Sequence, residues 1–103
     1  MKTCRTIIVN LYIAGDLATA RQACREYVAK GGCVTVAPCD YVYTNSCEAG
    51  VVVGFINYPP YAKLASDDIV ADAVALGEIL RARLCQSSFT VVGPNETITY
   101  GRD

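Results

Sequence analysis

The chain of 103 residues contains no histidine. Histidine is the side chain whose ordinary pKa lies closest to neutral pH, so the sequence offers no ready general base and no partner to activate a serine or cysteine nucleophile. The carboxylates are better explained as helix caps, turn residues and solvated helix positions than as acid–base pairs; they include Asp16, Asp40, Asp67, Asp68 and Asp72. A Walker loop and a Gly-x-Gly-x-x-Gly motif are also missing. These absences predict a protein that is not an enzyme and uses no cofactor.

No two cysteines have the Cys-x-x-Cys spacing, and without histidine the common zinc patterns are missing, so we expect no metal site. The N-terminal segment lacks the small-residue cleavage site of a secretory signal. We therefore expect an intracellular protein whose cysteines are free thiols, because the cytosol is reducing. The six cysteines are Cys4, Cys24, Cys33, Cys39, Cys47 and Cys85.

Charged residues are scarce, at 18% of the chain, and nine Lys and Arg face ten Asp and Glu for a net charge of −1. This balance provides no field for capturing long nucleic acid by counterion release. No apolar run approaches the roughly twenty residues that span a bilayer. Long nucleic acid and membranes are therefore not expected partners. Because apolar residues make up 52% of so small a chain, we expect part of its surface to be covered in an oligomer.

Hydrophobic periodicity predicts a single domain over residues 1–103 with the order βαββαββ. The expected strands are 5–13, a pair of segments 33–37 and 40–44 separated by Pro38, then 51–57, 88–92 and 97–100, and the expected helices are 16–30 and 66–84. Ser66 is the expected cap of the second helix, whose expected buried stripe is Ile69, Ala73, Leu76, Leu80 and Leu84. The fold class is α+β: a two-layer domain with a largely antiparallel five-stranded sheet, both helices on one face, and ferredoxin-like character. The other face would need cover, and a second copy is the expected partner.

Residues 41–61 carry the strongest binding signal. Two β-rich segments flank a polar turn at 45–50, and the second delivers Asn57, Tyr58 and Tyr61 to its exit. Aromatic rings beside a hydrogen-bonding amide suit a flat, polar molecule such as a purine, and two intervening prolines restrict the backbone before a ligand arrives. A hairpin and a proline-stiffened turn whose tyrosines only pack against the protein explain the same residues.

Three arginines are candidates for phosphate contacts, because guanidinium groups form bidentate pairs with phosphate oxygens. Arg102 follows the last expected strand, and Arg21 and Arg25 lie on the first expected helix. A solvated surface charge is the simpler explanation for each of them, because surface arginines seldom need a specific role.

Six short motifs, spread over almost the whole chain, carry a family resemblance. They are Asn10-Leu-Tyr-Ile-Ala-Gly15, the Arg-containing helix after it, Cys33-Val-Thr-Val36, Tyr41-x-Tyr-Thr44 with Glu48 and Gly50, Gly54-x-Ile-Asn-Tyr-Pro59, and Gln86-Ser-Ser-Phe-Thr-Val91. With these motifs the chain resembles the first-described family of phage anti-Thoeris proteins. It departs from that family at Asn45-Ser46, where the family usually has Gly-Gly, and at Pro60-Tyr61, where it usually has a basic residue and Phe.

The resemblance implies a non-catalytic sponge that sequesters a signalling nucleotide in the cytoplasm of the infected bacterial host. The ligands implied are cyclic ADP-ribose isomers and, for some members, cyclic trinucleotides; the assembly implied is a homodimer, in some members a hexamer. Carried onto this sequence, the family's site places Asn57, Tyr58 and Tyr61 near the adenine and ribose and Arg102 on the phosphates. Arg21 or Arg25 would belong to a second pocket between dimers.

Two other functions remain open from the sequence. One is an enzyme that degrades such cyclic nucleotides, and the other is a small protein-binding inhibitor or regulatory subunit without a nucleotide ligand.

Overall fold

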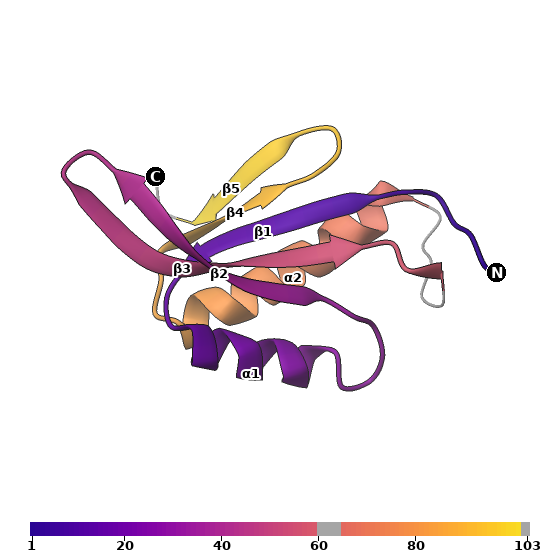
Figure 1. Cartoon of the computed structure of the whole chain (residues 1–103), viewed down its shortest axis with the longest axis horizontal. Helices are drawn as coiled ribbons and strands as arrows, with labels where there is room; N and C mark the ends of the chain where they lie inside the picture. Colours follow the sequence, from indigo (N-terminus) through magenta and orange to yellow (C-terminus); the bar gives the residue numbers. More distant parts are fainter. Residues whose placement is uncertain (60–64, 102–103) are drawn as a thin grey trace.

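The computed structural model describes residues 1–59 and 65–101. Five strands and two helices follow one another in the predicted order βαββαββ (Figure 1). They are β1 (Ile8–Ala14), α1 (Leu17–Tyr27), β2 (Thr35–Tyr43), β3 (Ser46–Ile56), α2 (Ser66–Arg83), β4 (Ser88–Val92) and β5 (Thr97–Gly101). Within these described ranges, no helix is both long and apolar enough to cross a membrane.

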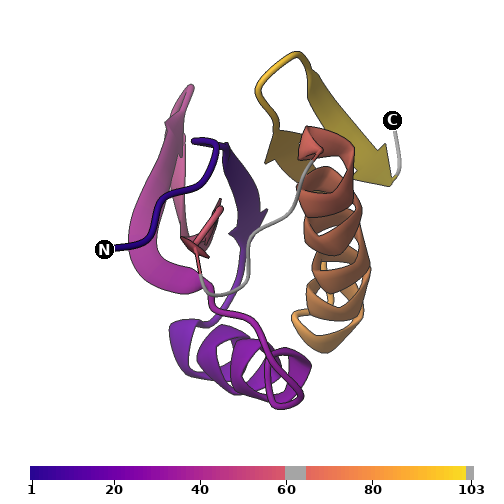
Figure 2. The same cartoon turned by 90° about the vertical axis from the view of Figure 1, so that its right-hand side faces the viewer.

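The five strands form one sheet in the order β2-β3-β1-β4-β5, and every neighbouring pair is antiparallel. Figure 2 shows the two helices side by side, with the curved sheet on one side of both. Helix α1 lies against β2 and β3, and α2 lies against β1 and β4. The predicted two-layer α+β fold is therefore confirmed.

Alternation along the strands sends one set of side chains toward the helices, because successive side chains of a strand point to opposite faces. In β1 the buried set is Val9, Leu11 and Ile13, which neighbours the buried valines of β3 and β4. The facing stripe of α2 is the predicted one, with all five members buried: Ile69, Ala73, Leu76, Leu80 and Leu84. This single layer of apolar contacts between sheet and helices is the core.

In the described part of the chain, no helix lies over the opposite face of the sheet. Ile8 and Ile56 are directly paired there and are 53% and 44% exposed, respectively. The sequence predicted such an uncovered face, and its cover by a second copy stays a prediction.

Two predictions about the β2–β3 hairpin differ from the structure. Strand β2 runs without interruption through Pro38. Proline has no backbone N–H to donate, but β2 is an edge strand, so no hydrogen bond inside the sheet is lost. The predicted turn at residues 45–50 is wrong. Tyr43 pairs with Ser46, so the chain reverses at Thr44 and Asn45, and Asn45 supplies the positive φ of 60°.

The helix ends agree with the sequence in part. Asp16 caps α1 as predicted, but the helix ends at Tyr27, and the positive φ of Gly31 and Gly32 belongs to the loop that follows. The predicted cap of α2 is wrong: Ser66 is the first helical residue, and Ala65 precedes it without a side-chain cap.

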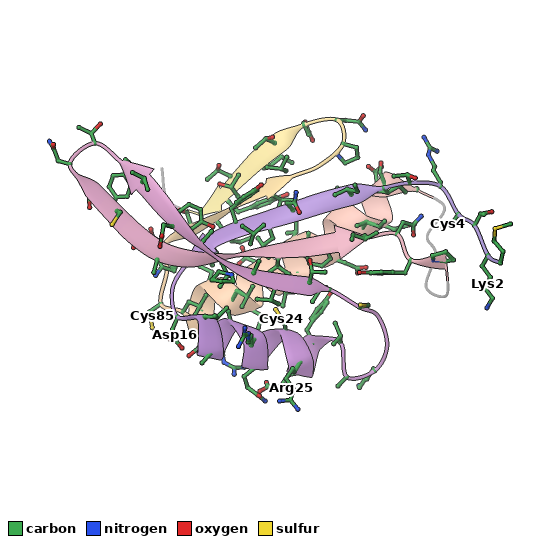
Figure 3. All side chains as sticks on the ribbon, in the orientation of Figure 1. Lys2, Cys4, Asp16, Cys24, Arg25 and Cys85 are labelled. Carbon is green, nitrogen blue, oxygen red and sulfur yellow. The ribbon has the colours of Figure 1, made fainter. Side chains whose placement is uncertain are left out.

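Replacing Asp16 by alanine is expected to lower the melting temperature at pH 7. Asp16 lies at the start of α1 (Figure 3). Its carboxylate accepts hydrogen bonds from the backbone N–H and the hydroxyl of Thr19, both at 2.8 Å, and these bonds lower the pKa of Asp16. A lowered pKa stabilises the fold above the ordinary value of about 4, and this contribution is lost as the pH falls through the lowered pKa. The melting temperatures of wild type and Asp16→Ala should therefore become equal in acid.

Asp16→Asn is the matched control for the cap, because an amide oxygen also accepts at the N-cap. Its melting temperature at pH 7 should therefore be closer to that of wild type than to that of Asp16→Ala. A difference between wild type and Asp16→Ala that stays constant down to pH 2 would contradict this role of the carboxylate.

Candidate functional site

A cavity of about 670 Å³ opens where both helices approach the end of β3. Its size lies within the range of about 300 to 1,000 Å³ that is usual for small-molecule sites. Four segments form the walls: the end of α1, the loop that joins α1 to β2, the exit of β3 and the first turns of α2. The lining residues are Tyr27, Val28, Lys30, Gly31, Gly32, Cys33, Val34, Phe55, Ile56, Asn57, Tyr58, Pro59, Ile69 and Asp72.

Tyr27 connects the two helices at the cavity wall. Its hydroxyl donates to the backbone carbonyl of Asp72 over 3.3 Å. Burial raises the pKa of the Tyr27 phenol, and the negative charge of Asp72 raises it further. The hydrogen bond therefore holds the Tyr27 ring against α2, and the Asp72 carboxylate lies close enough to raise the pKa of the phenol.

Tyr58 and Cys33 line two other walls, the exit of β3 and the loop after α1. Hydrogen bonding with the Cys33 thiol raises the pKa of the Tyr58 phenol. Tyr58 is half-buried. The sequence predicted Tyr58 as a ligand-binding residue, and it lines the cavity.

Asn57 lines the same cavity but also holds the N-terminal segment in place. It is 6% exposed, and its side-chain amide donates to the carbonyl of Arg5 over 2.8 Å. Its backbone N–H donates to the carbonyl of Ile7 over 3.0 Å, and its own carbonyl accepts from the Cys4 thiol over 2.9 Å. One donor of the predicted ligand-binding amide is thus engaged by the protein.

Among the described residues, the lining includes one acidic and one basic residue, Asp72 of α2 and Lys30 of the loop after α1. The sequence interpretation had placed Asp72 among the solvated helix positions. The signal that identifies it is its spacing: Asp72 lies three residues after Ile69 and one before Ala73, both in the buried stripe of α2. A carboxylate at that position lies beside the core.

The predicted site residues divide into three groups. Asn57 and Tyr58 lie together in the cavity. Arg21 and Arg25 are exposed on α1 and do not line it; Figure 3 shows Arg25 pointing away from the sheet. Tyr61 and Arg102 lie outside the described residues. Across residues 1–59 and 65–101, no group of three or more Cys, Asp or Glu side chains is arranged to hold a metal ion, and all six cysteines are free thiols.

The chain resembles solved proteins in structure but not in sequence. No family model and no curated protein matches the chain. A phage SAM lyase solved in its apo state superposes with a TM-score of 0.73 at 14% identity, over 100% of this chain and 96% of that one. A phage SAM lyase in complex with S-methyl-5′-thioadenosine superposes with a TM-score of 0.64 at 13% identity, over 99% of this chain and 94% of that one. At such low sequence identity, the structural similarity shows that the folds are alike and nothing further.

These neighbours contradict the prediction of a non-catalytic anti-defence sponge, because both are structures of an enzyme. The step that failed is the inference from the missing histidine, which excludes only reactions that need a base near neutral pH. The comparisons do not test the anti-Thoeris resemblance, the cyclic ADP-ribose and cyclic trinucleotide ligands, or the homodimer and hexamer. These stay predictions.

Proposed function

We propose that the protein is a lyase that cleaves S-adenosylmethionine and releases S-methyl-5′-thioadenosine. The observation that carries the proposal is the likeness over the whole chain to a phage SAM lyase, together with the thioadenosine held by the second neighbour. The reaction would take place in the bacterial cytoplasm, where S-adenosylmethionine is made.

The cavity suits the nucleoside part of this substrate. Tyr27, Phe55 and Tyr58 bring three aromatic rings to its walls. Stacking of a base on such a ring contributes about 1 to 3 kcal/mol. Aromatic faces also attract a cation, and the sulfonium of S-adenosylmethionine is one.

The chemistry fits a protein without histidine. A carboxylate oxygen of the substrate attacks Cγ of its own methionine side chain, the bond between Cγ and sulfur breaks, and its electron pair stays on sulfur. The products are neutral S-methyl-5′-thioadenosine and homoserine lactone. No proton is transferred, so the protein needs to hold the substrate folded for attack and to exclude water, in which the two reacting charges are best solvated.

Incubation with S-adenosylmethionine is expected to yield S-methyl-5′-thioadenosine and homoserine lactone in equal amounts, measured by chromatography and mass spectrometry. The rate should vary less than about twofold between pH 6 and 7, because the protein has no histidine and the α-amino group of the substrate titrates only at about pH 7.7 to 8.0. Heat-denatured protein serves as the blank, since the substrate also decays slowly by itself.

Two variants connect this activity to the cavity. Tyr58→Ala removes a ring from the wall and should lower kcat/KM by about tenfold, the lower end of the stacking range. Glu96→Ala changes an exposed residue outside the cavity and should leave kcat/KM unchanged. Substrate that stays intact, or that is converted to S-adenosylhomocysteine by methyl transfer, would refute the proposed function.

A further inference from the structure

The acidic wall of the cavity is built by one carboxylate and one ring. Asp72 is half-buried on α2, beside Ile69, which is 5% exposed. The hydroxyl of Tyr27 is tied to the backbone carbonyl of Asp72 over 3.3 Å. A negative charge and an aromatic face are the two groups that proteins use to recognise cations of low hydration.

The basic residue of the cavity lies on a different segment. Lys30 belongs to the loop after α1, and in the part of the chain that the structure describes it makes no ion pair with Asp72. The cavity therefore offers opposite charges from two of its walls. A ligand with both a cationic and an anionic group can enter in one preferred direction, its cation toward Asp72 and its carboxylate toward Lys30.

We propose that Asp72, together with the ring of Tyr27, selects the cationic sulfonium of the substrate over a neutral thioether. This inference rests on the proposed lyase function and deepens it, since it names the group that distinguishes substrate from product. Cleavage of the bond from Cγ to sulfur turns the sulfonium into a thioether. The attraction to Asp72 disappears in that step, and S-methyl-5′-thioadenosine is then held by its ring contacts alone.

The expected preference for the cation is about tenfold. The attraction between a carboxylate and a cation is strong in a dry interior and weak in water, and a half-buried carboxylate beside an open cavity lies toward the weaker end. The aromatic face adds to this attraction.

Calorimetry with two uncleavable ligands tests the inference. S-adenosylhomocysteine is the neutral thioether, and sinefungin carries a protonated amine in place of the sulfonium. Wild type should bind sinefungin about tenfold more tightly than S-adenosylhomocysteine. In Asp72→Asn this ratio should fall below about threefold, while the Kd for S-adenosylhomocysteine changes less than threefold. Asp68→Asn is the matched control, because Asp68 is exposed on the same helix outside the cavity and should keep the tenfold ratio.

The outcomes separate the inference from the proposed function. If Asp72→Asn keeps the tenfold ratio, or if wild type shows no preference, the selectivity assigned to Asp72 is wrong, whereas cleavage of S-adenosylmethionine by wild type would still support the lyase. If wild type binds neither ligand and leaves S-adenosylmethionine intact, both are wrong. A ratio lost equally in Asp68→Asn would show a general effect of helix charge and would also overturn the role of Asp72.

Discussion

Replacing Gly77 by alanine is expected to lower the free energy of unfolding by about 2 kcal/mol, although alanine favours helices more than glycine does by about 1 kcal/mol. Gly77 is a buried residue of α2, and a Cβ atom placed there would overlap the ring of Phe89 on β4. That ring has little room to retreat. It is 2% exposed, stacks on Tyr100 with ring centroids 5.1 Å apart, and lies 6.0 Å from the Arg81 guanidinium carbon.

Chemical denaturation measures this loss, and two variants isolate its cause. Ala75→Gly, at an exposed position of the same helix, should lower the free energy of unfolding by about 1 kcal/mol through helix propensity alone. In a Phe89→Leu background the ring is gone, so Gly77→Ala should become neutral or stabilising. A loss that is the same in both backgrounds would show that the contact with Phe89 is not responsible.

The same helix shows how much of the fold its sequence predicts. A buried stripe with helical spacing depends only on which side of α2 faces the sheet, so periodicity identified all five of its residues. Gly77 belongs to the same face, but its reason for being glycine is the ring of Phe89, twelve positions further along the chain. Contacts of this kind have no local signature.

The β2–β3 hairpin shows the opposite case, in which a local signature misleads. From Ser46 to Ala49, before Gly50, β3 pairs with β2 alone, and the paired side chains there are exposed or half-buried on both faces. Such a two-stranded arm has no buried face to impose alternation, so its polar residues look like a turn. Within this hairpin Asn45 was the reliable marker, because it has a positive φ and lies where the chain reverses.

The cavity residues also divide into those that the sequence marks locally and those that only the packing brings together. Asn57 and Tyr58 were found because they stand at the exit of a recognisable strand. Tyr27 and Asp72 come from the two helices, and only the packing of α1 beside α2 brings them to one wall. The proposed lyase reaction has no signature of this kind in the sequence. A substrate that carries its own nucleophile and its own leaving group would need no catalytic acid or base of the protein.

Asn57→Asp is expected to lower the free energy of unfolding by about 3 kcal/mol or more at pH 7. The change removes the N–H donor to the Arg5 carbonyl and places a carboxylate against that oxygen at a site that is 6% exposed. Burial raises the pKa of a carboxyl group, and the protonated form can again donate to Arg5. A raised pKa makes the stability greatest in acid and lowers it as the pH rises through the folded-state value. The deficit should therefore shrink toward pH 4, as measured by denaturation at several pH values.

Asn95→Asp is the control for the charge itself, because Asn95 is exposed in the turn between β4 and β5 and the same change there should cost little. Equal stability of wild type and Asn57→Asp at pH 7 would contradict the structural role of the amide.

The same variant also tests the role of Asn57 in the cavity. If Asn57→Asp at pH 5 recovers its stability and still cleaves S-adenosylmethionine, Asn57 acts by holding the N-terminal segment against the cavity wall. Recovered stability with activity lost would instead place the amide in contact with the substrate.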